Sequence, residues 1–238
     1  MDEKIARLRE LIAGSDNIVF FGGAGVSTES GIPDFRSVDG LYNQKYKYPP
    51  EEILSHDFLM DNPEEFYTFC REKLFVTGIQ PNKAHLRLAE LEAEGKLRAV
   101  VTQNIDGLHQ AAGSKNVLEL HGTTHRFYCA RCGKEMPEEA VYAGKGVPRC
   151  SCGGLVRPDV VLYGESLNER VITEAVMAIS QCDLLIVGGT SLNVYPAAGL
   201  INYYRGKQLV LINKQATPYD GSANLIINDK IGEVLGQV

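Results

Sequence analysis

The sequence predicts an α/β protein, in which a parallel sheet with helices on both faces is interrupted by a small metal-binding insertion. Short apolar runs alternate with helical segments, which is typical of right-handed crossovers between parallel strands. A glycine cluster follows the first run, and two pairs of cysteines interrupt the alternation. These three observations predict the architecture, and ligands of such sheets bind beyond the carboxyl ends of the strands.

The composition excludes several classes of protein. The chain has 238 residues, 44% of them hydrophobic, which predicts one large domain with a smaller one attached. A formal charge of −6 gives no basic surface, so we expect no contact with nucleic acid. The chain has neither a run of 18 apolar residues nor a secretion signal, so we expect a cytoplasmic protein with no membrane contact. Thiols stay reduced in that compartment, so the six cysteines need an explanation other than disulfides.

The helices and strands are predicted from the spacing of apolar residues. Helices are expected at 2–13, 61–75 and 82–94, the last with Leu86, Leu88, Ala89 and Leu91 on its apolar face. Residues 37–50 have no clear period and are expected to form a long loop. Strands of the parallel sheet are expected at 17–21, 98–102, 159–163, 184–187, 209–212 and 225–227.

Polar or glycine residues follow five of these strands, as a ligand site at the carboxyl edge requires. They are Gly22-Gly23, Thr102 to Asp106, Gly164-Glu165, Gly188 to Ser191, and Asn213-Lys214. Asn213 is placed to bond a ribose hydroxyl, although an asparagine at a strand end is as often a turn former.

The stretch 22–36, GGAGVSTESGIPDFR, is the feature around which the chain is organised. Its glycines let backbone N–H groups approach an anion, as in a phosphate-binding turn. The third position of the dinucleotide fingerprint is Thr28, and no second strand ending in an acid follows about 20 residues later. From these residues alone, a tight structural turn and a nucleotide site both remain open.

The cysteines predict a structural metal site. Cys129 and Cys132 form a C-x2-C pair, and Cys150 and Cys152 form a C-x-C pair after a 17-residue spacer. Two thiol pairs match the tetrahedral S4 site that Zn²⁺ favours, and four protein ligands leave no open position for catalysis. The alternative is a redox dithiol. Cys70 and Cys182 are expected to be buried core thiols.

His121 is the candidate general base. It follows the apolar run 118–120, and its imidazole is expected in the same crevice as Asn104 and Asp106. His85 and His109 lie within expected helices and are interpreted as structural. The residues by themselves therefore predict a nucleotide-binding enzyme with one histidine as acid or base.

Several motifs together resemble the sirtuins, the NAD-dependent protein lysine deacylases, over nearly the whole chain. They are GAGVSTESGIPDFR, TQNIDGLH, the HG at His121, the four cysteines, RPDVVLYGE and GTSLNVYPA. The resemblance implies a Rossmann-like large domain formed by 1–36, 79–124 and 159–238. It also implies a small domain with a cofactor-binding loop and helices at 37–78 and a zinc module at 125–158.

The resemblance implies that NAD is a reactant and that it gives nicotinamide and O-acetyl-ADP-ribose. His121 would act as the base on the ribose hydroxyls, Asn104 would orient a water or hydroxyl, and Asp106 would hold the nicotinamide amide. The other implied NAD contacts are Gly22, Ala24, Thr28, Phe35, Arg36, Gln103 and Ile105, with Thr190, Ser191, Asn213 and Lys230 around the adenosine half. An acetyl-lysine peptide would lie as an added strand against Val160, Gly164, Glu165, Val194 and Tyr195.

Two positions depart from the family pattern. Tyr163 stands where a phenylalanine is common, and its extra hydroxyl needs a partner. Sirtuins that prefer succinyl or malonyl lysine share a Tyr-x-x-Arg pair, whereas here Cys70 follows Tyr67 at that spacing and Arg71 is about 100° further round a helix. We therefore expect a preference for acetyl and other uncharged acyl groups.

Two other functions remain open from the sequence. One is mono-ADP-ribosyl transfer from NAD to protein, and the other is a non-catalytic module that senses NAD or ADP-ribose.

Overall fold

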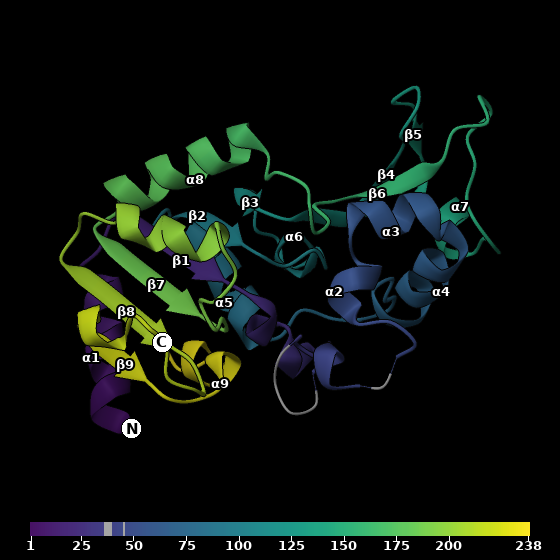
Figure 1. Cartoon of the computed structure of the whole chain (residues 1–238). Coiled ribbons are helices and arrows are strands. Elements are labelled where there is room, and N and C mark those ends of the chain that lie inside the picture. The colour runs from purple at the N-terminus through teal and green to yellow at the C-terminus, as the bar shows by residue number, and fades with distance from the viewer. Residues whose placement is uncertain (36–39, 45) are drawn as a thin grey trace.

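The computed structural model describes residues 1–35, 40–44 and 46–238, and within them the chain forms two units (Figure 1). The larger unit contains a parallel sheet with the strand order β3-β2-β1-β7-β8-β9. The strands are β1 (Ile18–Gly22), β2 (Leu97–Thr102), β3 (Val117–Glu119), β7 (Leu184–Gly188), β8 (Gln208–Ile212) and β9 (Leu225–Ile227). The α/β prediction is confirmed, and the strand order reverses between β1 and β7, where such sheets bind their ligands.

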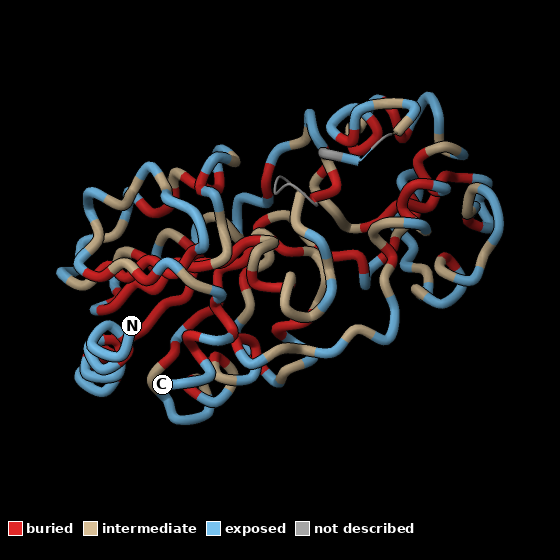
Figure 2. Tube along the Cα trace, turned by 90° about the horizontal axis from the view of Figure 1, so that it is seen from below, coloured by how far each residue is buried: buried red, intermediate tan, exposed pale blue. Residues whose placement is uncertain are grey.

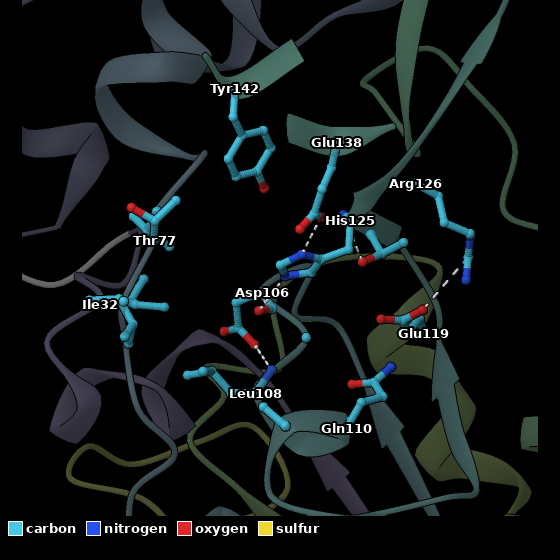
Figure 3. Close-up of a pocket in the computed structure, with 16 residues that line it drawn as sticks. Ile32, Thr77, Asp106, Leu108, Gln110, Glu119, His125, Arg126, Glu138 and Tyr142 are labelled. Atoms are coloured by element: carbon cyan, nitrogen blue, oxygen red, sulfur yellow. Dashed lines mark hydrogen bonds and ion pairs between the residues drawn. The ribbon is translucent and has the colours of Figure 1, made fainter. Parts of the chain in front are cut away.

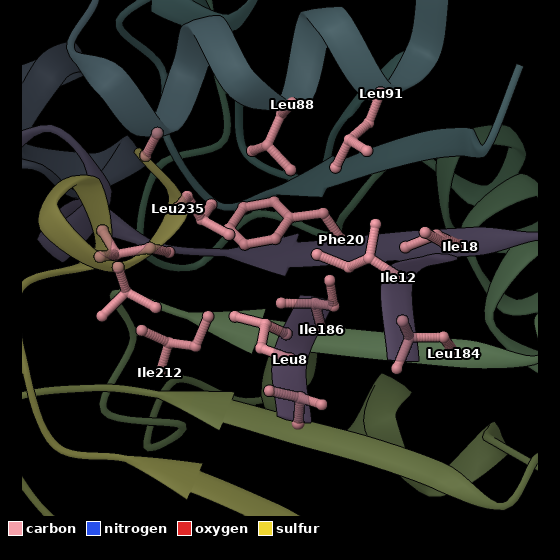
Figure 4. Close-up of a cluster of buried hydrophobic side chains, with 14 of the residues drawn as sticks. Leu8, Ile12, Ile18, Phe20, Leu88, Leu91, Leu184, Ile186, Ile212 and Leu235 are labelled. Atoms are coloured by element: carbon pink, nitrogen blue, oxygen red, sulfur yellow. The ribbon is translucent and has the colours of Figure 1, made fainter. Parts of the chain in front are cut away.

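Helices cover both faces of this sheet because the side chains of each strand alternate between them. On one face, α1 (Asp2–Ala13), α5 (Lys83–Ala93) and α9 (Ile231–Leu235) pack around Phe20, as Figure 4 shows. On the other, α8 (Glu169–Gln181) and the 3-10 helix Ala197–Tyr203 cover the side chains of Val19 and Phe21. The central strands are buried along their whole length (Figure 2), which explains their continuous apolar sequences.

The smaller unit combines short helices with an antiparallel sheet of order β5-β4-β6. Its elements are α2 (Pro50–Ile53), α3 (His56–Asp61), α4 (Pro63–Lys73), β4 (Gly122–Cys129), β5 (Glu135–Met136), α7 (Glu138–Tyr142) and β6 (Val156–Val160). A separate hydrophobic cluster, which includes Phe66, Phe75 and Phe127, fills this unit. The short helix α6 (Leu108–Ala111) follows β2 and packs against α5.

The prediction that residues 159–163 form a strand of the parallel sheet is wrong. The strand in this region is β6, which ends at Val160 and pairs antiparallel with β4 in the smaller unit. Gly164 and Glu165 therefore do not follow a strand of the main sheet. The apolar run at 118–120 instead provides the edge strand β3. A short apolar run indicates a buried strand, but it does not indicate which sheet the strand joins.

The helical predictions hold with two corrections. The helix expected at 61–75 is α4, which spans only Pro63–Lys73 because α3 ends at Asp61 and Pro63, which lacks an N–H group, begins the new helix. On α5, Leu88 and Leu91 are fully buried, but Leu86 is 47% exposed and does not belong to the apolar face. His85, His109, Cys70 and Cys182 are buried, as expected. Among the described residues, no helix is long and apolar enough to cross a membrane.

Replacing Leu88 with alanine tests the packing of α5 on the sheet. We expect Leu88→Ala to lower the free energy of unfolding by about 2–5 kcal/mol, since it removes a fully buried side chain. Leu86→Ala, on the exposed side of the same helix, is the control and should change it by less than about 0.5 kcal/mol. Urea unfolding of both variants measures the difference, and equal effects would contradict the assigned orientation of α5.

Candidate active site

Two glycine turns meet where the strand order reverses. The turn after β1 and the turn after β7 are joined by a hydrogen bond from the Gly25 N–H to the Gly189 oxygen, 2.8 Å long. A Cβ atom on Gly25 would lie 2.8 Å from the Cα of Gly189, so neither a side chain nor a wider turn fits there. Gly22 ends β1, Ala24 begins the 3-10 helix that follows, and the Thr28 hydroxyl donates to the Gly25 oxygen at 3.0 Å. Main chain is thus the principal surface that this turn offers to a ligand.

Ser27 links the two polar residues that follow β2. Its hydroxyl donates to Asp106 Oδ2 at 2.6 Å and accepts from Asn104 Nδ2 at 3.1 Å. Asp106 Oδ1 also accepts from the N–H of Leu108 at 3.0 Å. The structure therefore brings Asn104 and Asp106 together through a buried serine that sequence reasoning did not select. A serine in a glycine-rich turn is common, and nothing local in the sequence marks it as a link to residues about 80 positions away.

His121 lies two residues beyond β3, and its ring is held in one tautomer. Nδ1 lies 3.0 Å from the main-chain oxygen of Gln103. A carbonyl oxygen only accepts, so Nδ1 carries the proton of the neutral ring and Nε2 carries the lone pair. Burial lowers the pKa of His121 below its ordinary value, although the bond to Gln103 acts in the opposite direction. The ring is therefore neutral near pH 7 and is able to accept a proton at Nε2.

The turn after β7 is fixed by two side chains, one that follows β8 and one that follows β2. The amide of Asn213 bonds the main chain of Thr190 twice, at 3.0 Å from its N–H and 2.8 Å to its oxygen. The side-chain amide of Gln103 donates to the Thr190 hydroxyl at 3.1 Å. Ser191 and Lys230 are exposed, and Lys230 lies at the start of α9. In this structure the amide of Asn213 is directed at Thr190 and supports the turn.

The described ends of the loop after residue 33 are paired with each other. The N–H groups of Leu41 and Tyr42 donate to the oxygens of Asp34 and Phe35, each at 2.8 Å. The ring of Tyr42 packs edge-on to Phe35 at 5.5 Å between centroids, and its hydroxyl lies 2.5 Å from that of Tyr163. The extra hydroxyl of Tyr163 thus has a partner. Arg36, which we expected to contact NAD, lies outside the described residues, as do residues 37–39 and 45 of the loop expected at 37–50.

The expected peptide-binding segments lie on the two units. Val160 pairs with Gly122 of β4, and Gly164 lies in a turn with a left-handed φ of +88°. Ile105, an expected NAD contact, accepts a main-chain hydrogen bond from Thr124 of β4. The carboxylate of Glu165 bonds Arg157, the Leu162 N–H and His56. Burial would raise the pKa of Glu165, but these donors lower it to about 2. The side chain is therefore ionised, and its hydrogen bonds are made within the smaller unit. Gly164 offers exposed main chain at this turn, Tyr195 is 67% exposed, and the oxygen of Val194 accepts from the Ala198 N–H.

A cavity of about 540 Å³ lies between the two units, behind the loop that carries Asp106 (Figure 3). Its wall includes Ile32, Thr77, Asp106, His125, Glu138 and Tyr142. Among the predicted site residues that the structure describes, Asp106 alone lines it. The cavity adjoins the loop that carries Asp106, and sequence reasoning did not predict it.

The four cysteines of the smaller unit converge on one point. Their sulfur atoms lie within 4.8 Å of one another, with the pairs Cys129–Cys152, Cys132–Cys152 and Cys132–Cys150 at 3.5, 3.6 and 3.7 Å. A tetrahedral zinc site with Zn–S bonds of about 2.3 Å has S–S edges of about 3.8 Å, so the cluster fits zinc. The N–H of Cys152 lowers the pKa of Cys150 to about 6, whereas hydrogen bonds from the neighbouring thiols raise the pKa of Cys132 to about 11. Position 154, next to the cysteine cluster, requires glycine because a Cβ there would lie 2.5 Å from the Cys129 sulfur.

The metal site has a direct test. In a Cys129→Ser, Cys150→Ser double variant, we expect metal content and thermal stability to fall together, because the four ligands join two turns about 20 residues apart and their metal-binding free energy contributes to folding. Cys182→Ala removes a buried thiol outside the cluster and should keep the metal. Atomic absorption and thermal unfolding measure the two properties. An unfolding midpoint that does not move when zinc is lost would refute the structural role.

A family profile, curated relatives and solved structures all match this chain over most of its length. The profile described as "Sir2 family" matches residues 23–196. The chain is 60% identical to the "NAD-dependent protein deacetylase" of Clostridium perfringens and 58% identical to that of Clostridium acetobutylicum, with 98–100% of each chain covered. The solved structure "Sir2-p53 peptide-NAD+" matches with a TM-score of 0.87 and 42% identity, covering 97% of this chain and 95% of that one. Another, "Structural Basis for the Mechanism and Regulation of Sir2 Enzymes", matches with a TM-score of 0.90 and 42% identity over 100% of this chain and 96% of that one. The chain thus matches these proteins over nearly its full length, in sequence and in fold, and it belongs to the Sir2 family.

Proposed function

We propose that this chain removes acetyl and other uncharged acyl groups from protein lysine side chains, consumes NAD, and releases nicotinamide and O-acetyl-ADP-ribose. The observation that carries the proposal is the neutral His121, whose Nε2 lone pair is available beside the Asn104–Ser27–Asp106 cluster. The names of the curated relatives and the solved Sir2 complexes with NAD and with deacetylated peptide support it.

The residues at the carboxyl edge fit NAD as the co-substrate. The main chain of Gly22, Ala24 and the neighbouring turn lies at the switch point of the sheet, where a pyrophosphate has N–H donors and no side chains in its way. Thr28, Phe35, Gln103, Ile105 and Asp106 are proposed to surround the nicotinamide ribose. Thr190, Ser191, Asn213 and Lys230 are proposed for the adenosine half. When bound, NAD supplies an electrophilic ribose carbon whose bond to nicotinamide breaks.

His121 is proposed to take a proton from a ribose hydroxyl. A hydroxyl is a poor nucleophile near neutral pH, and a positioned base typically contributes about 10²–10⁴-fold in rate. The bond from Nδ1 to Gln103 fixes the ring so that Nε2 is the basic atom, and it stabilises the imidazolium that forms. Asn104 is 8% exposed and its amide is fixed by Ser27, so it is proposed to orient a hydroxyl or water without moving.

The peptide is proposed to bind by main-chain hydrogen bonds between the turn at Gly164 and the segment at Val194. The side chain of Glu165 is already bonded within the smaller unit, which favours recognition through the backbone of this turn. The Val160 oxygen already accepts from Arg157, so Val160 is proposed as a packing contact. We therefore expect broad sequence tolerance around the acetyl-lysine.

We also propose the domain boundaries and location given by the sequence. The separate hydrophobic cluster of the smaller unit, which draws on 53–75 and 127–162, supports a small domain built from two inserted segments. The described cysteines form no disulfide, which supports a reducing, cytoplasmic location.

Mass spectrometry of the products tests the function. With NAD and an acetyl-lysine peptide, we expect free lysine, nicotinamide and O-acetyl-ADP-ribose in equal amounts. His121→Ala should bind NAD within a few-fold of wild type while turnover falls by at least about 10²-fold, since it removes the base but no part of the glycine turns. ADP-ribose attached to protein would indicate ADP-ribosyl transfer instead. NAD binding with no peptide-dependent nicotinamide release would indicate a sensing module.

Acyl preference follows from the packing of α4. The Tyr67 hydroxyl donates to the Val156 oxygen, and Arg71 donates to the Val141 oxygen and lies over the Tyr67 ring at 5.3 Å. The Tyr67 hydroxyl and Arg71 Nε are thus bonded within the smaller unit, Arg71 Nη2 is buried without a partner among the described residues, and Cys70 offers no charge to a carboxylate. We expect kcat/KM on an acetyl-lysine peptide to exceed that on the matched succinyl-lysine peptide by more than tenfold. Faster removal of succinyl than of acetyl groups would contradict the expected preference for uncharged acyl groups.

A further inference from the structure

His125 joins the smaller unit to the loop that carries Asp106 (Figure 3). It lies on β4, and its Nε2 is 3.0 Å from the main-chain oxygen of Asp106. Its Nδ1 is 2.7 Å from the carboxylate of Glu138 on α7. The ring also covers Gly107, where a Cβ would lie 2.7 Å from it and where the φ of +68° favours glycine. The residue therefore fixes the loop and α7 relative to each other.

Both ring nitrogens of His125 face an acceptor. A carbonyl oxygen accepts and never donates, and the ionised carboxylate of Glu138 does the same. A neutral imidazole has a single N–H, so one of the two contacts would set a lone pair against an oxygen. Only the imidazolium, with two N–H donors, satisfies both contacts.

The surroundings of the ring favour its charged form. Burial by itself lowers the pKa of His125, but the bonds to Asp106 and Glu138 and the charge of Glu119 outweigh it, and the pKa is raised. The other charged groups near the ring come from three strands and partly cancel: Arg126 on β4 pairs with Glu119 at 3.7 Å and with Asp159 at 2.9 Å. Tyr142, at the end of α7, completes this wall, while residues 76–79 opposite carry no titratable side chain.

Asp106 is thereby held from two sides. Ser27 and the Leu108 N–H bind its carboxylate, and His125 binds its main-chain oxygen. The preceding oxygen, that of Ile105, accepts from the N–H and the hydroxyl of Thr124 at 3.0 and 2.9 Å. Strand β4 thus binds two successive carbonyls of the loop, and only the contact through His125 depends on protonation.

We propose that protonated His125 is a positioning residue for the Asp106 loop, and that loss of its proton weakens the binding of the nicotinamide end of NAD. This inference rests on the proposed role of Asp106 in holding nicotinamide. Below the pKa of His125 both bonds are present, and as the pH rises through that pKa one of them is lost. The KM for NAD should therefore be constant on the acid side and rise about fivefold on the alkaline side, which is the low end of measured couplings between sites.

The pH profile of KM for NAD is the first test. In His125→Gln, KM should be raised at low pH and show no alkaline inflection, because the group that titrates is gone. In Glu138→Gln, the inflection should move to lower pH, since the carboxylate that favours the imidazolium is neutralised. Glu139→Gln removes a neighbouring exposed carboxylate with no contact to the ring and should match wild type. An unchanged inflection in His125→Gln would overturn the proposal.

NMR titration of the His125 ring separates positioning from a purely structural role. Because coupling is reciprocal, a non-hydrolysable NAD analogue should raise the pKa of His125. ADP-ribose carries the same diphosphate without nicotinamide and should leave that pKa unchanged. Equal values with both ligands would refute the inference. If Asp106→Asn leaves KM for NAD unaltered while the analogue still shifts the pKa of His125, the proposed role of Asp106 fails and the coupling to His125 stands.

Discussion

The close approach of the two glycine turns, fixed by the bond from Gly25 to Gly189, is the contact on which the site depends. It closes the edge of the sheet where the strand order reverses, and it leaves main-chain groups facing the space beyond. The polar residues after β2 and β7 are then supported in turn. Ser27, within the first turn, bonds Asn104 and Asp106, and Gln103 and Asn213 bond Thr190 in the second. A side chain at Gly25 would separate the turns and remove the support for both groups.

The smaller unit contributes to the site through β4 more than through its helices. This strand begins next to His121, binds the carbonyls of Ile105 and Asp106 through Thr124 and His125, and ends at the first zinc ligand, Cys129. The cysteine cluster thus lies at one end of the strand that binds the loop carrying Asp106. A metal held there would stabilise β4 without itself contacting that loop.

His121 and His125 each lie 3.0 Å from a main-chain oxygen of the loop after β2, but their surroundings favour different protonation states. His121 donates through Nδ1 to one carbonyl, and no acidic side chain among the described residues shifts its pKa, so burial dominates and the ring is neutral. His125 lies between a carbonyl and a carboxylate, and its pKa is raised. One ring is thus suited to accept a proton and the other to hold two hydrogen bonds.

The sequence by itself determined the features that depend on local pattern. The alternation of apolar runs and helices predicted the α/β sheet, the glycines predicted a close turn at β1, and the spacing of Cys129, Cys132, Cys150 and Cys152 predicted their cluster. Only the tertiary structure decided which sheet β6 joins, because a run of five residues is equally compatible with either pairing. It also decided the contacts of Ser27 with Asp106, of Tyr42 with Tyr163 and of His125 with Glu138. These join residues on different elements, and side chains that meet only when two chain segments fold together leave no periodic signal in the sequence.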